Sequence, residues 1–296
     1  MIDMTNDLMW SVFKPLWKDL QEAGDGSLLV CGGYGLFLKQ SWLLRNSDTL
    51  IVVPLTQWLD AQPRVTKDFD IVLGLGLIAE EHSQRKIRAV LEKHGLKVTQ
   101  ENPMWQFEKQ ISENRRVLLE LHAPVPTGQQ VGLQVDRIRV KRKPSLHEDG
   151  IHGRTNAEAV GCDLSPFRFD LDDVSFTATN PVTWCVMKLT AMSDQYRQSI
   201  DVAHSREDRA FCRNQAVKHA KDVCRIIAMV TRDEMDISSM VINSIRSMPQ
   251  FTKAVEINVE FFQPDEGWGV LAAGGDWESG DFRLIRDILA SWFRKS

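Results

Sequence analysis

The chain has 296 residues, of which 43% are hydrophobic and 26% charged, a balance typical of a folded protein with one or two domains and not of a disordered chain. Its net charge of −4 gives no overall attraction to nucleic acid, so any such binding requires a local basic patch. The five cysteines form no Cys-x-x-Cys pair, and the sequence shows neither a signal peptide nor an apolar run of about 20 residues. We therefore expect a cytoplasmic protein without disulfides or membrane segments.

The N-terminal region predicts a helix, a strand and a glycine turn. Residues 4–23 carry apolar side chains at helical spacing, which predicts an amphipathic helix that packs on the first strand. Residues 28–31 read as a buried strand that runs into Gly32 and Gly33, with a helix from about Gly35. The free backbone N–H groups of such a turn can hold a phosphate, although glycine pairs are often only tight turns.

The segment from Arg64 to Leu73 places Asp68 and Asp70 two residues apart on a predicted strand over 69–73. Side chains alternate along a strand, so the two carboxylates point the same way at a separation of roughly 6–7 Å. Two acids at this distance repel unless a cation lies between them. The spacing therefore predicts a site for divalent cations, with Mg²⁺ as the natural candidate and Mn²⁺ as the substitute.

Further along the chain, a helix is predicted over 80–94 and strands near 96–100, 115–122 and 131–142. A third acid would complete the metal site. Glu120 lies among four apolar neighbours on a predicted central strand, where an acid without a role would be costly to bury. Asp136 is the alternative, and the sequence favours Glu120.

The second half of the chain is predicted to be helical. Residues 144–180 are rich in Gly, Pro, Asp and Asn and read as a linker or extension with short strands at 167–169 and 174–178. Helices are predicted over 181–196, 214–231, 237–247 and 281–295. The expected fold is α/β (α+β), a mixed sheet with flanking helices in a core over 1–143, followed by a helical domain over 181–296.

Four segments together resemble a known family. They are the Gly32-Gly33 turn opening a helix, Arg64-x-Thr66-x-Asp68-x-Asp70, Lys188-Leu189-Thr190-Ala191 and Lys221-Asp222. The combination resembles the DNA polymerase β-type nucleotidyltransferase superfamily, most closely its AbiEii-like branch of bacterial toxin and defence proteins. One departure is Arg225, which stands where the family commonly has a second acid after Lys-Asp.

The resemblance implies an enzyme that transfers NMP from an NTP to a hydroxyl acceptor, either the 3′ end of tRNA or other RNA, or a protein side chain. It implies a metal on Asp68, Asp70 and Glu120. Its nucleotide-binding residues would be Gly32, Gly33, Thr66, Lys188 and Asp222. A partner antitoxin is the expected regulator. The alternative of another class is a degenerate, non-catalytic protein that binds a nucleotide or a partner.

A basic stripe follows the predicted acid site. Its members occupy alternate positions of one strand, and they are Arg137, Arg139, Lys141 and Lys143. Four cations on one face could contact an RNA backbone, or they could protect a solvated edge strand.

Two other sequence features are assigned no function. Gly74-x-Gly76 mimics a dinucleotide-binding turn, but the acids before it would repel a pyrophosphate without metal. The scattered histidines are interpreted as surface residues.

Overall fold

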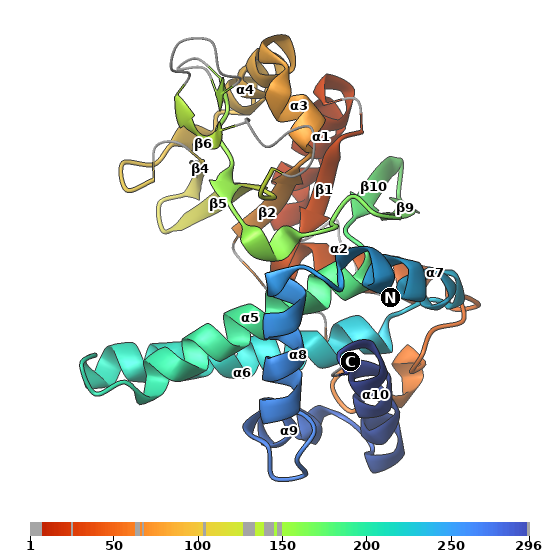
Figure 1. Cartoon of the computed structure of the whole chain (residues 1–296). Helices are drawn as coiled ribbons and strands as arrows, with labels where there is room; N and C mark the ends of the chain where they lie inside the picture. The colour runs from red at the N-terminus through yellow and green to blue at the C-terminus, as the bar shows by residue number, and fades with distance from the viewer. Residues whose placement is uncertain are drawn as a thin grey trace. The chain divides into compact units, whose positions relative to one another are not determined.

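The protein is described from a computed structural model. The described residues are 8–24, 26–62, 66, 68–102, 105–126 and 150–294, together with the backbone of 134–138 and 145–146. The chain divides into two compact units, one formed by Met1–Arg45 with Pro63–Thr179 and the other by Asn46–Gln62 with Asn180–Ser296. The first unit is α/β with a mixed sheet and the second is helical, as the sequence predicts (Figure 1).

The first unit is built on one mixed sheet with the strand order β3-β4-β5-β2-β1-β10-β9, and β8 pairs with β5. The strands are β1 (Leu28–Cys31), β2 (Asp68–Leu73), β3 (Lys97–Val98), β4 (Gln106–Ser112), β5 (Arg115–Ala123), β8 (Arg154–Thr155), β9 (Phe167–Leu171) and β10 (Val174–Ala178). β2 is antiparallel to β1 and parallel to β5. The backbone of β6 (Gln134–Ile138) pairs with β7 (Ser145–Leu146) in a separate sheet.

An aromatic core holds two helices on one face of this sheet. The helices of the unit are α1 (Leu8–Ala23), α2 (Gly32–Arg45), α3 (Leu75–Ala79) and α4 (Glu81–Lys93). Phe13 of α1 and Tyr34 of α2 both contact Phe69 of β2, with ring centroids 4.4 and 4.7 Å apart. Because strand side chains alternate, the neighbours of Phe69, Asp68 and Asp70, point to the other face. Packing of Phe69 into this core therefore directs the side chains of Asp68 and Asp70 to the opposite face of the sheet.

The second unit consists of α5 (Pro181–Ile200), α6 (Arg206–Ala228), α7 (Arg232–Ile245), α8 (Pro249–Phe261), α9 (Trp268–Ala273) and α10 (Ser279–Trp292). α5 and α6 pack along each other as a long pair (Figure 1). Both helices begin at an N-cap residue. The Asn180 side chain accepts a hydrogen bond from the Thr183 amide at the start of α5, and the Ser205 side chain accepts one from the Asp208 amide at the start of α6.

The helical unit also contains residues 46–62 from the first half of the chain. The amides of Val52 and Val53 donate to the carbonyls of Val230 and Ala228, each over 3.1 Å. Residues 150–179, within the expected linker, contribute β8, β9 and β10 to the sheet of the first unit. Local composition predicts neither the membership of residues 46–62 in the helical unit nor that of residues 150–179 in the first unit.

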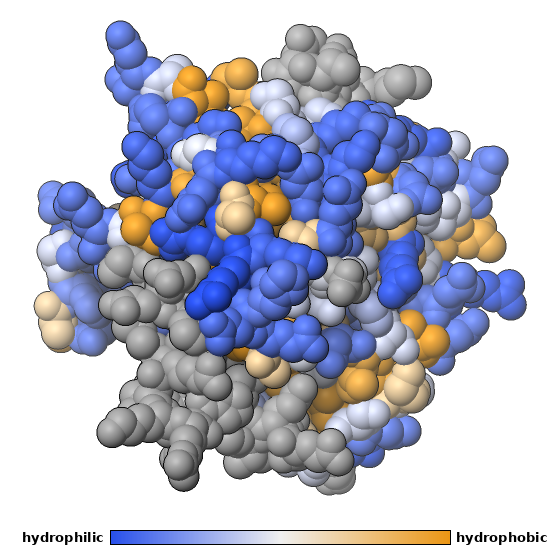
Figure 2. All heavy atoms as spheres, turned by 90° about the horizontal axis from the view of Figure 1, so that it is seen from above, coloured by the Kyte–Doolittle hydropathy of each residue, from blue (hydrophilic) through white to orange (hydrophobic). Residues whose placement is uncertain are grey.

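Two features concern the surface. No helix among the described residues is long and apolar enough to cross a bilayer. On the face drawn in Figure 2, the described residues are mostly hydrophilic, and the apolar ones form small separate groups. This face therefore presents no large continuous apolar patch among its described residues.

Candidate functional site

The register of the central strands brings acidic residues together. Asp70 of β2 lies opposite Cys31 of β1 on one side and opposite Glu120 of β5 on the other. Residues that are opposite in register share a face of the sheet. Both carboxylates are partly exposed on this face, whereas Phe69 and Leu119 on the other face are fully buried.

His122, two residues beyond Glu120, completes a cluster of three possible metal ligands. Its Nε2 atom lies 3.3 Å from Oδ1 of Asp70 and 3.7 Å from Oε2 of Glu120. Among the described residues, Asp70, Glu120 and His122 are the group whose ligand atoms all lie within 4.8 Å of one another. Two carboxylates and an imidazole are donors that divalent metal ions use in proteins. These three side chains could therefore hold one ion.

Gly32 fits directly against the acid site. It has a φ of +64°, which a residue with a side chain rarely adopts. A Cβ atom at this position would lie 1.7 Å from Oδ2 of Asp70. Gly33 follows as a buried residue in the first turn of α2, so the helix begins at Gly32 and not near residue 35. The glycine pair and the acid strand therefore meet, as the predicted phosphate and metal sites require.

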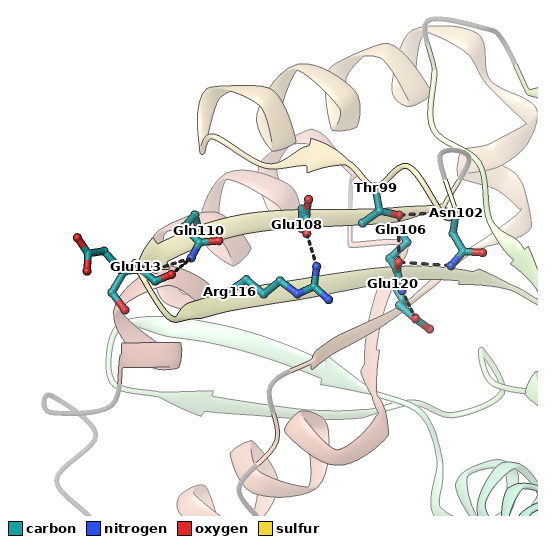
Figure 3. Close-up of polar contacts among 9 residues, drawn as sticks. Thr99, Asn102, Gln106, Glu108, Gln110, Glu113, Arg116 and Glu120 are labelled. Carbon is teal, nitrogen blue, oxygen red and sulfur yellow. Dashed lines mark hydrogen bonds and ion pairs between the residues drawn. The ribbon is translucent and has the colours of Figure 1, made fainter. Parts of the chain in front are cut away.

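A chain of hydrogen bonds orients Glu120 from the neighbouring strand (Figure 3). The side-chain amide of Gln106 donates to Oε1 of Glu120 over 2.6 Å. The oxygen of the same amide accepts hydrogen bonds from Thr99 and Asn102, over 3.0 and 3.4 Å. Because Oε1 is engaged, Oε2 is the oxygen of Glu120 that faces His122.

Asp68 and Thr66 lie at the entry of β2. Asp68 shares the face of Asp70 by strand alternation, but it does not belong to the group of three ligand atoms within 4.8 Å. The hydroxyl of the buried Thr66 accepts a hydrogen bond from the Asp68 amide over 3.4 Å. Thr66 thus has a local contact that helps to define the start of the strand.

Lys188 and Asp222 pair inside the helical unit. The Nζ atom of Lys188 on α5 lies 2.9 Å from Oδ2 of Asp222 on α6, with 8% and 1% of the two side chains exposed. Nδ1 of His219 lies 3.8 Å from the same oxygen. The structure therefore brings together the lysine and the acid that the resemblance implies, as a buried ion pair. Arg225, the departure from the family pattern, lies 3.6 Å from Asp60 of the 46–62 segment.

Two of the remaining predicted residues lie on β6. The β6 backbone carries Asp136 and Arg137 and pairs with β7, whereas Glu120 lies beside Asp70 in the main sheet. The other members of the stripe, Arg139, Lys141 and Lys143, lie outside the described residues, as does Arg64.

The interpretation of the histidines as surface residues is wrong for two of them. His122 is 8% exposed and His152 is 6% exposed. The sequence contained one usable signal: His122 lies two residues after Glu120 on a strand, so the two side chains share a face. Its proximity to Asp70 depends on pairing between β2 and β5, which no local pattern specifies.

Comparison of the chain with protein-family models, with curated proteins and with solved structures gives no match.

Proposed function

We propose that this protein is a metal-dependent nucleotidyltransferase, which transfers NMP from an NTP to a hydroxyl acceptor. The observation that carries this proposal is the pairing of Asp70 with Glu120 across β2 and β5, with Gly32 packed against Asp70. Two carboxylates on adjacent strands repel each other unless a cation stabilises them, and both remain accessible. The specific nucleotidyltransferase fold is part of the proposal.

In this proposal the acidic residues and the glycine turn have different roles in the reaction. Asp70 and Glu120, with Asp68 at the entry of the same strand face, would hold the cation, which would neutralise charge on the triphosphate and lower the pKa of the attacking hydroxyl. Gly32 and Gly33 open α2, whose first N–H groups face outward from the helix end and suit a phosphate. The acceptor oxygen then bonds to the α-phosphorus, and the bond to pyrophosphate breaks.

The acceptor and the biological role belong to the same proposal. An RNA 3′ end and a protein side chain both supply the required hydroxyl. The resemblance to toxin and defence proteins supports the proposal that this protein is a toxin whose activity is inhibited by an antitoxin. A cytoplasmic location would place the enzyme beside NTP and RNA.

Incubation of the purified protein with each α-labelled NTP, Mg²⁺ or Mn²⁺, and total RNA tests the proposal. We expect label on RNA or on protein, and we expect Asp70→Asn to reduce transfer by a factor of about 10³ or more because the cation loses a charged ligand. Asp163→Asn, which removes an exposed carboxylate of the same unit, is the matched control and should retain activity. Nucleotide binding without transfer in the wild type would instead support a non-catalytic binding protein.

A further inference from the structure

We infer that the cation site of the proposed nucleotidyltransferase is completed by His122 and binds a first-row transition-metal ion, for which Mn²⁺ is the probe, more tightly than Mg²⁺. The inference deepens the proposed function, since it concerns the metal preference of the same site and rests on the premise that the site holds a cation. It follows from the donor set Asp70, Glu120 and His122.

The positions of the donor atoms suit a single ion. Nε2 of His122 lies 3.3 Å from Oδ1 of Asp70 and 3.7 Å from Oε2 of Glu120. Two ligands that each lie about 2.1 Å from one ion are separated by roughly 3–4.2 Å, depending on the angle between them. Nδ1 of His122 is buried without a hydrogen-bond partner among the described residues, so Nε2 is the nitrogen directed at the acids.

The surroundings of Glu120 hold it in a ligand-like orientation. Gln106 engages Oε1, and Thr99 and Asn102 fix the Gln106 amide by donating to its oxygen (Figure 3). Gln106 and Thr99 are both less than a tenth exposed. Outer residues that orient a metal ligand in this way commonly change metal affinity by about 10–100-fold when they are replaced. The site therefore has a built supporting shell.

Among the described residues, Arg154 is a further cation near the site. Nη1 of Arg154 lies 3.9 Å from Oε2 of Glu120, but 59% of its side chain is exposed, so its hold on the acid is weak. Metal binding measured directly shows whether a metal ion offsets the charge of the two acids.

The imidazole nitrogen of His122 favours transition-metal ions over Mg²⁺. Mg²⁺ prefers oxygen ligands and holds its water tightly, whereas first-row transition-metal ions accept imidazole nitrogen, with an affinity that rises from Mn²⁺ towards Cu²⁺. A site of carboxylates alone would give Mg²⁺ no such disadvantage. Addition of the His122 nitrogen to the carboxylates thus shifts the preference towards transition metals.

The test measures metal binding by the full chain without NTP or acceptor, at one fixed neutral pH. Loss of the free Mn²⁺ signal in electron paramagnetic resonance gives the Mn²⁺ affinity, and displacement by added Mg²⁺ gives the Mg²⁺ affinity. We expect Mn²⁺ to bind at least about tenfold more tightly. Spin-echo modulation of the bound Mn²⁺ should show a directly coordinated imidazole nitrogen.

His122→Asn should remove the nitrogen coupling and weaken Mn²⁺ binding by about tenfold or more, with Mg²⁺ binding much less affected. His82→Asn replaces an exposed histidine of the same unit and should change neither. If His122→Asn does not fold, the wild-type spectrum and the affinity ratio still decide the question.

Equal affinities for the two ions, absent nitrogen coupling, or no binding of either ion would overturn the inference. Failure of the proposed function gives a different result, in which Mn²⁺ binds with nitrogen coupling but no label is transferred from NTP. Transfer of label with no preference for Mn²⁺ would keep the function and reject the role of His122.

Discussion

At the scale of single residues, the contact between Gly32 and Asp70 makes the sharpest prediction. Gly32→Ala should destabilise the protein and displace the Asp70 carboxylate. The new Cβ would lie 1.7 Å from Oδ2 and 2.8 Å from the Cβ of Asp70, so rotation of the carboxylate alone cannot relieve the clash. Urea unfolding and Mn²⁺ binding measure the two effects.

Gly26→Ala is the matched control. Gly26 has a φ of +73°, and nothing lies within 4 Å of the Cβ that it lacks. It should therefore show only the left-handed backbone cost of about 1–2 kcal/mol. We expect Gly32→Ala to exceed it by about 2 kcal/mol or more. Equal losses in the two variants would show that the fit of Gly32 to Asp70 is unimportant.

The pair of Lys188 and Asp222 predicts a loss of stability on neutralisation of the lysine. Lys188→Met removes the charge that faces a carboxylate of which 1% is exposed, and breaking a buried pair in this way typically costs about 3–5 kcal/mol. The double variant Lys188→Met with Asp222→Leu should recover much of this loss, since no buried charge remains from the pair. Urea unfolding curves of the single and double variants check both statements.

Lys253→Met is the control for this experiment. Lys253 pairs with Asp194 over 3.3 Å at an exposed position, and such pairs contribute about 0.2–1 kcal/mol. A similarly small effect of Lys188→Met would argue that its pair is not structural. If Lys188 also contacts phosphate, NTP affinity should fall in the double variant even where stability is recovered.

At the scale of secondary structure, segments with a clear apolar pattern were predicted, whereas β4 and α8 were not. The apolar runs of β1 and β2 and the periodicity of α4 identify those elements from sequence alone. β4 was not predicted, because Gln106–Ser112 is mostly polar and becomes a strand through its pairing with β5. α8 was also missed, since β-branched residues such as Val255 and Ile257 lower helix propensity.

The same limit applies to the candidate site. The spacing of Asp68 and Asp70 and the burial of the strand carrying Glu120 are local features, and they led to the acids. His122 and Gln106 join the site through strand register, which links residues far apart in the chain. Sequence patterns therefore identified Asp70 and Glu120, two of the three clustered side chains, but not His122.

The packing of α1 against α4 predicts a pH-dependent contribution to stability. Lys93 and then His94 hydrogen-bond to Asp19 over 2.7 and 2.8 Å, and they lower the pKa of its carboxyl below the usual 3.8. A carboxyl with a lowered folded-state pKa stabilises the fold above its unfolded pKa, and this contribution disappears as the pH falls through the folded pKa. Asp19→Asn should lower the melting temperature slightly at neutral pH and not at strongly acidic pH.

Melting curves of wild type and Asp19→Asn across a pH series measure this difference, with Glu113→Gln at an exposed position of the same unit as the control. Added salt should reduce the effect at neutral pH, because Lys93 is largely exposed. An effect that persists unchanged at acidic pH would assign the role of Asp19 to packing and not to charge.

At the scale of the whole molecule, the helical unit is discontinuous in sequence. Residues 46–62 join it through the bridge between Ile51 and Thr231 and through Trp58, whose ring lies 4.8 Å from that of Trp277. This segment lies between α2 and β2 in the chain, so its position in the sequence suggests that it belongs to the first unit. Long-range backbone pairing places it with the second.

The cysteines allow the two units to be followed separately. All five are buried thiols. Cys31 and Cys162 lie in the first unit, and Cys185, Cys212 and Cys224 lie in the second. Burial raises the pKa of Cys162 to about 12 and also raises the pKa of Cys224, which suppresses the reactive thiolate.

We therefore expect no rapid thiol alkylation of the native protein and full reaction of all five thiols after denaturation. In a denaturant titration with short alkylation pulses, thiols of the same unit should become reactive together, because each unit encloses its own core and opens as a unit. Peptide mass spectrometry assigns the modified positions. Rapid reaction of any thiol in the native protein, or different midpoints for Cys31 and Cys162, would contradict this description of the first unit as one cooperative body.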